Sequence, residues 1–144
     1  MAAKRSAQAI WENDLLKGSG RFKVQSGALP ESPISWAART EQSGGKTSPE
    51  ELLAAAHGGC LTMSVASELT QAGAPPTRLD TTCLIVMDEV EGEGHQIVAS
   101  HITIAVDADA GDDAVGAAIE RADAGCPFST LLRKAGVDVT IARA

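Results

Sequence analysis

The sequence is poor in aromatic residues and in positive charge. It contains two tryptophans, two phenylalanines and no tyrosine, which leaves few side chains on which bases or sugars could stack. Twelve basic residues oppose nineteen acidic ones, giving a net charge of −7. This balance disfavours binding to nucleic-acid phosphates or to a membrane surface that carries anionic lipid. We therefore expect neither nucleic acid nor a membrane among the partners.

Long apolar runs are missing as well. No stretch reaches the roughly 20 apolar residues of a membrane span. The opening MAAKRSAQAIWEND has two basic residues but lacks the apolar segment of a secretory signal, so we expect a cytoplasmic protein. The three cysteines are an odd number and do not describe a structural disulfide scaffold in a reducing compartment.

What is present describes one globular domain over residues 1–144, with 44% hydrophobic and 22% charged residues. The first 40 residues predict three strands, because apolar and polar residues alternate in SAQAIW, RFKVQ and ISWAART. The third of these predicted strands carries a charged residue, Arg39, at the end of a face of small residues.

A long helix is predicted from Ser48 to about Gln71. Ser48 suits the N-cap, Pro49 suits the first helical position, and Glu51 completes a capping box. Apolar residues cover most of the circumference of this helix, so it should be buried on nearly all sides. One sheet of so small a chain cannot supply that cover, and we expect a partner subunit to do so.

The second half predicts a hairpin, two helices and a last strand. TTCLIVMDEV and HQIVASHITIAVD read as strands joined by the turn EGEG. An amphipathic helix ends at Gly125, a short helix restarts with Pro127 at its first position, and VDVTIA alternates again. Strands and helices are segregated along the chain, which predicts an α+β fold with largely antiparallel sheets and a long buried central helix.

The three cysteines differ in their surroundings. Cys83 lies in an apolar strand and is interpreted as packing. Cys126 stands near a helix N-terminus, which lowers a thiol pKa, although a small residue at a tight corner between helices explains it equally well. Cys60 lies too far along its helix to gain from the helix dipole. Taken alone it reads as a core cysteine, and its reactivity would require a neighbouring cation.

Gly58 and Gly59 precede Cys60 and cost roughly 2 kcal/mol against alanine in a helix interior. They predict a closely packed neighbour, which we expect across a dimer. His57 is interpreted as a packed or locally hydrogen-bonded residue. The pair of His57 and Cys60 lacks a second pair of ligands at zinc spacing, so no metal site is expected.

Two motifs resemble one known family. TSPEELLAAAHGGC (47–60) and AGCPFS (124–129) together resemble the OsmC/Ohr family of thiol-dependent hydroperoxide reductases. The opening AIWENDLLKGSGRFKVQSG (9–27) is similar to the OsmC branch of that family. The resemblance extends over essentially the whole chain, although two glycines precede Cys60 where the family more often has alanines.

The resemblance implies a two-cysteine peroxidase. Cys60 matches the peroxidatic position and Cys126 the resolving one, with a disulfide forming between them. Arg39 matches the arginine that stabilises the reactive thiolate, and Glu50 matches the glutamate that holds this arginine. The family fold is an intertwined α+β homodimer with its active sites at the interface.

The implied substrates are organic hydroperoxides and, more weakly, hydrogen peroxide. The implied reductant is an external dithiol, which family members commonly take from lipoylated proteins, and no bound cofactor is expected. Two alternatives remain at this stage. One is a non-enzymatic OsmC-fold dimeric binding or stress protein with vestigial thiols, and the other is a zinc protein that uses Cys60 and Cys126.

Overall fold

The computed structural model describes all 144 residues as six strands and four helices. The chain divides into two compact units, Met1–Leu52 and Leu53–Ala144, each described by itself. A single domain over residues 1–144 stays a prediction. No helix combines the length and the apolar content that a membrane crossing requires.

The first unit contains a three-stranded antiparallel sheet in the order β1-β2-β3. Its strands are β1 (Ala7–Glu12), β2 (Ser19–Val24) and β3 (Ser32–Ile34). Phe22 of β2 is buried, as expected for the apolar face of an alternating strand. The first two predicted strands are therefore confirmed.

The prediction that ISWAART is a strand is wrong. Strand β3 ends at Ile34, and a short helix, α1 (Trp36–Thr40), follows. The hydroxyl of Ser35 accepts a hydrogen bond from the backbone N–H of Ala38 at 3.1 Å. This cap offers the backbone a helical alternative to the sheet ladder. Arg39 therefore stands on a helix rather than on a strand.

The long helix α2 (Pro49–Gln71) has the predicted bounds. Its N-cap forms as expected, with the backbone N–H of Glu51 donating to Ser48 Oγ at 3.2 Å. The capping box is only half formed, because the carboxylate of Glu51 accepts from the hydroxyl of Thr47 at 2.6 Å instead of returning to Ser48.

Within this chain α2 is not buried on nearly all sides. Its buried residues form one stripe: His57, Gly58, Leu61, Val65 and Leu69. Met63 on the same helix has 69% of its surface exposed. Cover for the remaining face by a second copy of the chain stays a prediction.

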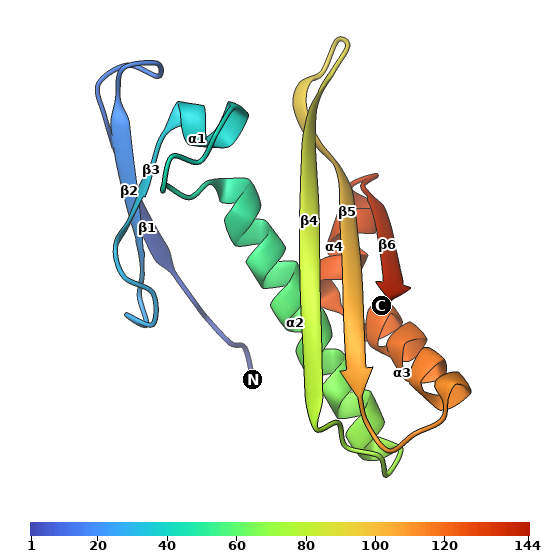
Figure 1. The fold of residues 1–144 in the computed structure, drawn as a ribbon. Helices are drawn as coiled ribbons and strands as arrows, with labels where there is room; N and C mark the ends of the chain where they lie inside the picture. Colours follow the sequence, from blue (N-terminus) through green and yellow to red (C-terminus); the bar gives the residue numbers. More distant parts are fainter. The chain divides into compact units, whose positions relative to one another are not determined.

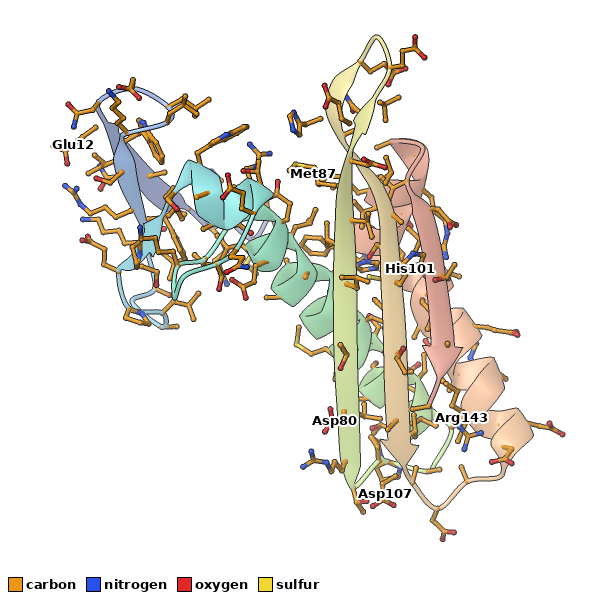
Figure 2. The ribbon with its side chains drawn as sticks, turned by 45° about the horizontal axis from the view of Figure 1, so that its top comes forward. Glu12, Asp80, Met87, His101, Asp107 and Arg143 are labelled. Carbon is orange, nitrogen blue, oxygen red and sulfur yellow. The ribbon has the colours of Figure 1, made fainter.

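The second unit contains a sheet in the order β4-β5-β6 (Figure 1). The strands β4 (Arg78–Val90) and β5 (Gly94–Asp107) form the predicted antiparallel hairpin, and β6 (Asp138–Arg143) joins β5 in parallel. Figure 2 labels Asp80, His101 and Arg143 on these three strands. The sheets are thus largely antiparallel, as predicted.

Helices α3 (Asp112–Gly125) and α4 (Pro127–Lys134) meet at Cys126. The predicted end at Gly125 and the predicted proline at the start of α4 are confirmed. The core of this unit combines apolar residues of α2, α3 and β5, and Cys126 belongs to it: Leu61, Val65, Leu69, Ile102, Ile104, Val115, Ala118, Ile119, Ala122 and Cys126. The fold class is α+β.

Candidate functional site

Two cysteines that are 66 residues apart in the sequence lie in contact. The Sγ atoms of Cys60 and Cys126 are 3.5 Å apart, and the thiol of Cys126 donates toward the sulfur of Cys60. Both residues carry free thiols. A disulfide bond is about 2.0 Å long, so an approach of roughly 1.5 Å joins the two sulfurs. The two sulfurs are therefore close enough for a disulfide to form once they approach each other.

The two thiols differ in exposure and in backbone setting. Cys60 lies in the middle of α2 and is half-buried, whereas Cys126 is fully buried at the N-cap of α4. The proline at 127 starts α4 immediately after Cys126. A small molecule therefore reaches Cys60 more readily than it reaches Cys126.

Burial raises the pKa of the Cys60 thiol, and the neighbouring Cys126 thiol raises it further. The backbone N–H of Phe128 and the hydroxyl of Ser64 act in the opposite direction, because both donate to the sulfur. These opposing groups leave the pKa above its ordinary value. Since the groups in residues 53–144 that act on this thiol include no cation, they favour the neutral thiol over the thiolate.

The first unit contains an ion pair between Arg39 of α1 and Glu50 in the first turn of α2. Arg39 Nε donates to Glu50 Oε1 at 2.8 Å, and the carboxylate side chain is only 12% exposed. The guanidinium also lies 5.9 Å from the centre of the Trp36 ring, within the range of a cation–π contact. The pair uses Nε and not the terminal guanidinium nitrogens, which can therefore donate to another anion.

The second carboxylate oxygen, Glu50 Oε2, is buried without a hydrogen-bond partner. Buried carboxylate oxygens ordinarily accept at least one hydrogen bond. Glu50 therefore has an unused acceptor next to the arginine that it holds.

Gly58 has its close neighbour within the same chain. A Cβ added at this position would lie 3.1 Å from Cys83 Cβ on β4, whereas a Cβ added at Gly59 would meet nothing within 4 Å. The prediction that both glycines admit a neighbour across a dimer is therefore wrong for Gly58. The bare backbone at 58 lets α2 approach its own sheet, and Cys83 fills the space.

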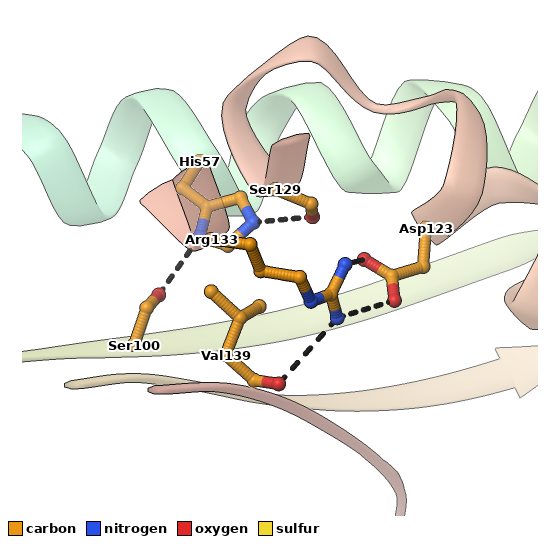
Figure 3. A network of polar contacts seen from close by, with 6 residues as sticks. All are labelled: His57, Ser100, Asp123, Ser129, Arg133 and Val139. Carbon is orange, nitrogen blue, oxygen red and sulfur yellow. Dashed lines mark hydrogen bonds and ion pairs between the residues drawn. The ribbon is translucent and has the colours of Figure 1, made fainter. Parts of the chain in front are cut away.

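His57 is fully buried and hydrogen-bonded through both ring nitrogens (Figure 3). Its Nδ1 lies 2.8 Å from Ser100 Oγ on β5, and its Nε2 lies 2.8 Å from Ser129 Oγ on α4. The interpretation of His57 as a packed, hydrogen-bonded residue is confirmed. Burial lowers the pKa of its imidazole, the charge of Asp123 opposes that change, and the charge of Arg133 adds to it.

Asp123 and Arg133 form a bidentate ion pair beside this histidine (Figure 3), with N–O distances of 2.9 and 2.6 Å. Arg133 also donates to the backbone oxygen of Val139 at 3.4 Å. Burial by itself would raise the pKa of Asp123. Hydrogen bonds from Arg133 and Ser129, together with the nearby positive charge, outweigh burial and hold this pKa below its usual range.

The structure thus brings the four predicted site residues together as two pairs. Cys60 contacts Cys126 in the second unit, and Arg39 contacts Glu50 in the first. The predicted approach of Arg39 to Cys60 stays a prediction, because each unit is described by itself.

Sequence reasoning missed the polar network around His57. Its members are Ser100, Asp123, Ser129 and Arg133. One signal is visible in the sequence, because both His57 and Cys60, and Cys126 and Ser129, are spaced by three residues. That spacing places each pair on one helical face but does not say that the two faces meet.

Comparison with known proteins places the chain in a family. A family model described as "OsmC-like protein" matches residues 42–142. The peroxiredoxin OsmC of Escherichia coli (strain K12) is 37% identical over 136 residues, which cover 92% of each chain. A peroxiredoxin OsmC from Shigella flexneri matches to the same extent.

Solved structures share the fold at lower identity. An organic hydroperoxide resistance protein OsmC from Legionella pneumophila superposes with a TM-score of 0.79 at 17% identity, covering 99% of both chains. The organic hydroperoxide resistance protein OhrB of Bacillus subtilis gives 0.73 at 18% identity, covering 96% of this chain and 98% of that one. The fold, the family model and the identity to the Escherichia coli protein agree, and this chain therefore belongs to the OsmC/Ohr family, on its OsmC branch.

Proposed function

We propose that this protein is a thiol-dependent peroxidase that reduces organic hydroperoxides and, more weakly, hydrogen peroxide. The observation that carries the proposal is the 3.5 Å contact between the sulfurs of Cys60 and Cys126. It is supported by membership of a family in which the 37% identical relative bears the name peroxiredoxin.

In the first step the Cys60 thiolate attacks the O–O bond of the hydroperoxide. The sulfur takes up one oxygen as a sulfenic acid, and the other oxygen leaves with a proton as an alcohol, or as water from hydrogen peroxide. Cys60 takes this role because it is the more exposed of the two thiols in contact.

In the second step the Cys126 thiol condenses with the sulfenic acid. A Cys60–Cys126 disulfide forms and one water molecule leaves, which protects Cys60 from further oxidation. The short distance between the sulfurs supports this step, since a pair held in contact reacts as if at high local concentration.

An external dithiol then restores both thiols through a mixed disulfide. Family members commonly obtain that dithiol from lipoylated proteins, and we propose the same class of partner here. The protein would need no bound cofactor, because the two cysteines carry the electrons.

Thiolate formation requires a cation, because the groups around Cys60 in residues 53–144 raise its pKa. We assign this role to Arg39, held by Glu50. Use of Nε for the ion pair supports the assignment, since the terminal guanidinium nitrogens can then face a thiolate.

We propose that the protein acts as an intertwined homodimer, in which a second copy covers the exposed face of α2. The exposure of Met63 on that face supports this arrangement. Apolar surface left uncovered on a central helix favours association with a partner.

One observation favours a second candidate, a non-enzymatic dimeric binding or stress protein with vestigial thiols. Within the chain the pKa of Cys60 lies above its ordinary value, whereas a peroxidatic thiol must ionise near neutral pH. Titration of Cys60 by its alkylation rate separates the candidates, because the peroxidase requires a pKa clearly below about 8.5.

The deciding experiment measures cumene hydroperoxide consumption in the presence of a dithiol. We expect Cys60→Ser to abolish it and Cys83→Ser, which removes the third cysteine, to leave it close to wild type. Equal rates in Cys60→Ser and wild type would exclude the peroxidase. Peptide mapping after one equivalent of peroxide should find a disulfide between Cys60 and Cys126.

A further inference from the structure

We propose that His57 is a positioning residue that holds the resolving cysteine against the peroxidatic one, by binding Ser129 one helical turn from the cysteine pair. This inference rests on the proposed function for its consequence in catalysis. Its geometry is independent of that function.

Two neighbouring side-chain contacts join α2 to the start of α4. His57 contacts Ser129 at 2.8 Å, and Cys60 contacts Cys126 at 3.5 Å. On each segment the two partners are three residues apart, a rise of about 4.5 Å in a helix. Cys60 follows His57 on α2, whereas its partner Cys126 precedes Ser129, the partner of His57. The two facing segments therefore run antiparallel.

The direction of the hydrogen bonds follows from the carboxylate at one end. The hydroxyl of Ser129 helps to lower the pKa of Asp123, whose carboxylate can only accept, so we assign the single hydroxyl proton of Ser129 to this carboxylate. Ser129 Oγ must then accept from His57, which places the imidazole proton on Nε2. His57 Nδ1 consequently accepts from the hydroxyl of Ser100.

The hydrogen-bond network around His57 extends to Cys83. Ser100 gives its proton to His57, so its oxygen can accept from the thiol of Cys83, which lies 3.6 Å away. Every polar group of His57 and both serines is thereby satisfied inside the core. A histidine with a fixed tautomer and two partners anchors α4 more firmly than apolar packing alone, since any shift would leave buried donors unpaired.

An ion pair holds the opposite end of α4. The ion pair between Asp123 and Arg133 ties α4 to α3 across the corner that contains Cys126. His57 adds the link from this corner to α2, the helix that carries Cys60. Loss of the link lets the corner move relative to Cys60, and a displacement of about 1 Å matters when disulfide closure requires only roughly 1.5 Å.

The consequence in catalysis is a competition for the sulfenic acid on Cys60. Attack by the Cys126 sulfur forms the disulfide and releases water, whereas a second hydroperoxide converts the sulfenic acid to a sulfinic acid and releases an alcohol. The hydrogen bond from His57 to Ser129 favours the first outcome, because it keeps Cys126 within reach.

Two substitutions at one position separate the two hydrogen bonds. In His57→Gln the side-chain amide reaches as far as Nε2 and can still donate to Ser129. In His57→Asn the amide reaches only as far as Nδ1, so it can accept from Ser100 but not bind Ser129. A matched control is Thr62→Val, which removes the 2.8 Å hydrogen bond between Thr62 and Thr81. That bond also ties α2 to the rest of the unit without touching α4.

The primary measurement is the equilibrium of the Cys60–Cys126 disulfide with a glutathione redox buffer, which reports the effective concentration of one thiol at the other. We expect His57→Asn to lower it about tenfold, the factor that corresponds to losing one ordinary hydrogen bond. His57→Gln and Thr62→Val should stay close to wild type. Equal values for the Asn and Gln variants, or an equal loss in Thr62→Val, overturn the inference.

Ser129→Ala tests the same contact from the other helix, in case His57→Asn does not fold. It should also lose about tenfold in effective concentration, and the double variant with His57→Asn should lose no more than either single variant. An unchanged value in Ser129→Ala overturns the inference.

Excess cumene hydroperoxide supplies the catalytic readout. His57→Asn should accumulate about tenfold more Cys60 sulfinate per turnover while the initial attack on the peroxide keeps its wild-type rate. A purely structural role would slow both steps. Failure of the wild type to react with peroxide removes the proposed function, but the glutathione equilibrium still decides the role of His57.

Discussion

Cys60 Sγ on α2 lies 3.5 Å from Cys126 Sγ at the start of α4, although 66 residues separate them in the sequence. Because Cys126 is fully buried and Cys60 is half-buried, a molecule that arrives from solvent meets the sulfur of Cys60 first. The contact therefore suits a sequence of two events, oxidation of Cys60 followed by capture by Cys126.

Cys126→Ser should uncouple these two events. The variant keeps the first attack on peroxide, but its Cys60 sulfenic acid has no partner thiol and proceeds to the sulfinic acid. We expect overoxidation at a cumene hydroperoxide concentration at least about tenfold below that of the wild type, because an intramolecular thiol in contact competes far better than a dissolved one. Intact-protein mass spectrometry after graded peroxide doses measures this. Overoxidation at wild-type doses would remove the resolving role of Cys126.

Arg39→Ala should slow the attack on peroxide by roughly tenfold to a hundredfold, the range for losing one hydrogen bond to a charged group. The alkylation rate of Cys60 should shift to higher pH in this variant, since the thiolate loses its cation. Stopped-flow consumption of cumene hydroperoxide and iodoacetamide alkylation report the two effects.

The matched control for Arg39 is Arg121→Ala. Arg121 also donates through Nε to a carboxylate, that of Glu68 at 2.7 Å, so its loss removes an ion pair of the same geometry. This control should keep the wild-type rate and pH profile. If both alanine variants lose the same rate, the slower reaction of Arg39→Ala reflects the loss of any positive charge from the protein. Arg39 would then have no specific role in stabilising the Cys60 thiolate.

His57 should make the protein less stable in mild acid. Burial lowers the pKa of its imidazole in the folded state below the value of 6.5 in an unfolded chain. The associated stability is fully present above about pH 6.5 and is lost as the pH falls through the folded value. Urea unfolding at a series of pH values between 7.5 and 5 measures the free energy of unfolding. A pH series of the His57→Gln variant should lack this contribution.

The control for this pH series is His101→Asn, which removes an exposed histidine that contacts Thr140. This variant keeps His57 and should therefore keep the acid-induced loss of stability that His57 causes. If the free energy of unfolding of His57→Gln falls in acid as much as that of the control, a group other than His57 causes the fall.

Gly58 and Gly59 should respond differently to alanine. Within one chain, Gly59→Ala should gain about 1 kcal/mol of helix propensity, because its new Cβ meets nothing within 4 Å there; a second copy packed on the face of Met63 would reduce this gain. Gly58→Ala gains the same propensity, but its Cβ comes to 3.1 Å from Cys83 Cβ and forces α2 or β4 to shift. Chemical denaturation should rank Gly58→Ala below Gly59→Ala, and the reverse order would contradict the close packing of Gly58 on Cys83.

Much of the local structure could be predicted from the sequence. The bounds of α2, the hairpin of β4 and β5, and the proline start of α4 depend on caps, turns and alternation within a few residues. ISWAART misled the strand prediction, because alternation continues through Ser35 whereas the hydroxyl of that serine caps a helix. Over so short a segment, one side-chain hydrogen bond outweighs the periodic pattern.

By itself, the sequence determined three of the four helices, most of the strands and the family motifs, because these depend on residue types and on short spacings along the chain. The four candidate site residues followed from the resemblance that those motifs carry. Only the tertiary structure decided that Cys126 meets Cys60, that His57 binds Ser100 and Ser129, and that Cys83 is the neighbour for which Gly58 leaves room. These contacts join α2 to β4, β5 and α4 across many residues of intervening chain. Which helical face meets which partner is set by the packing of the whole core, and no local pattern encodes it.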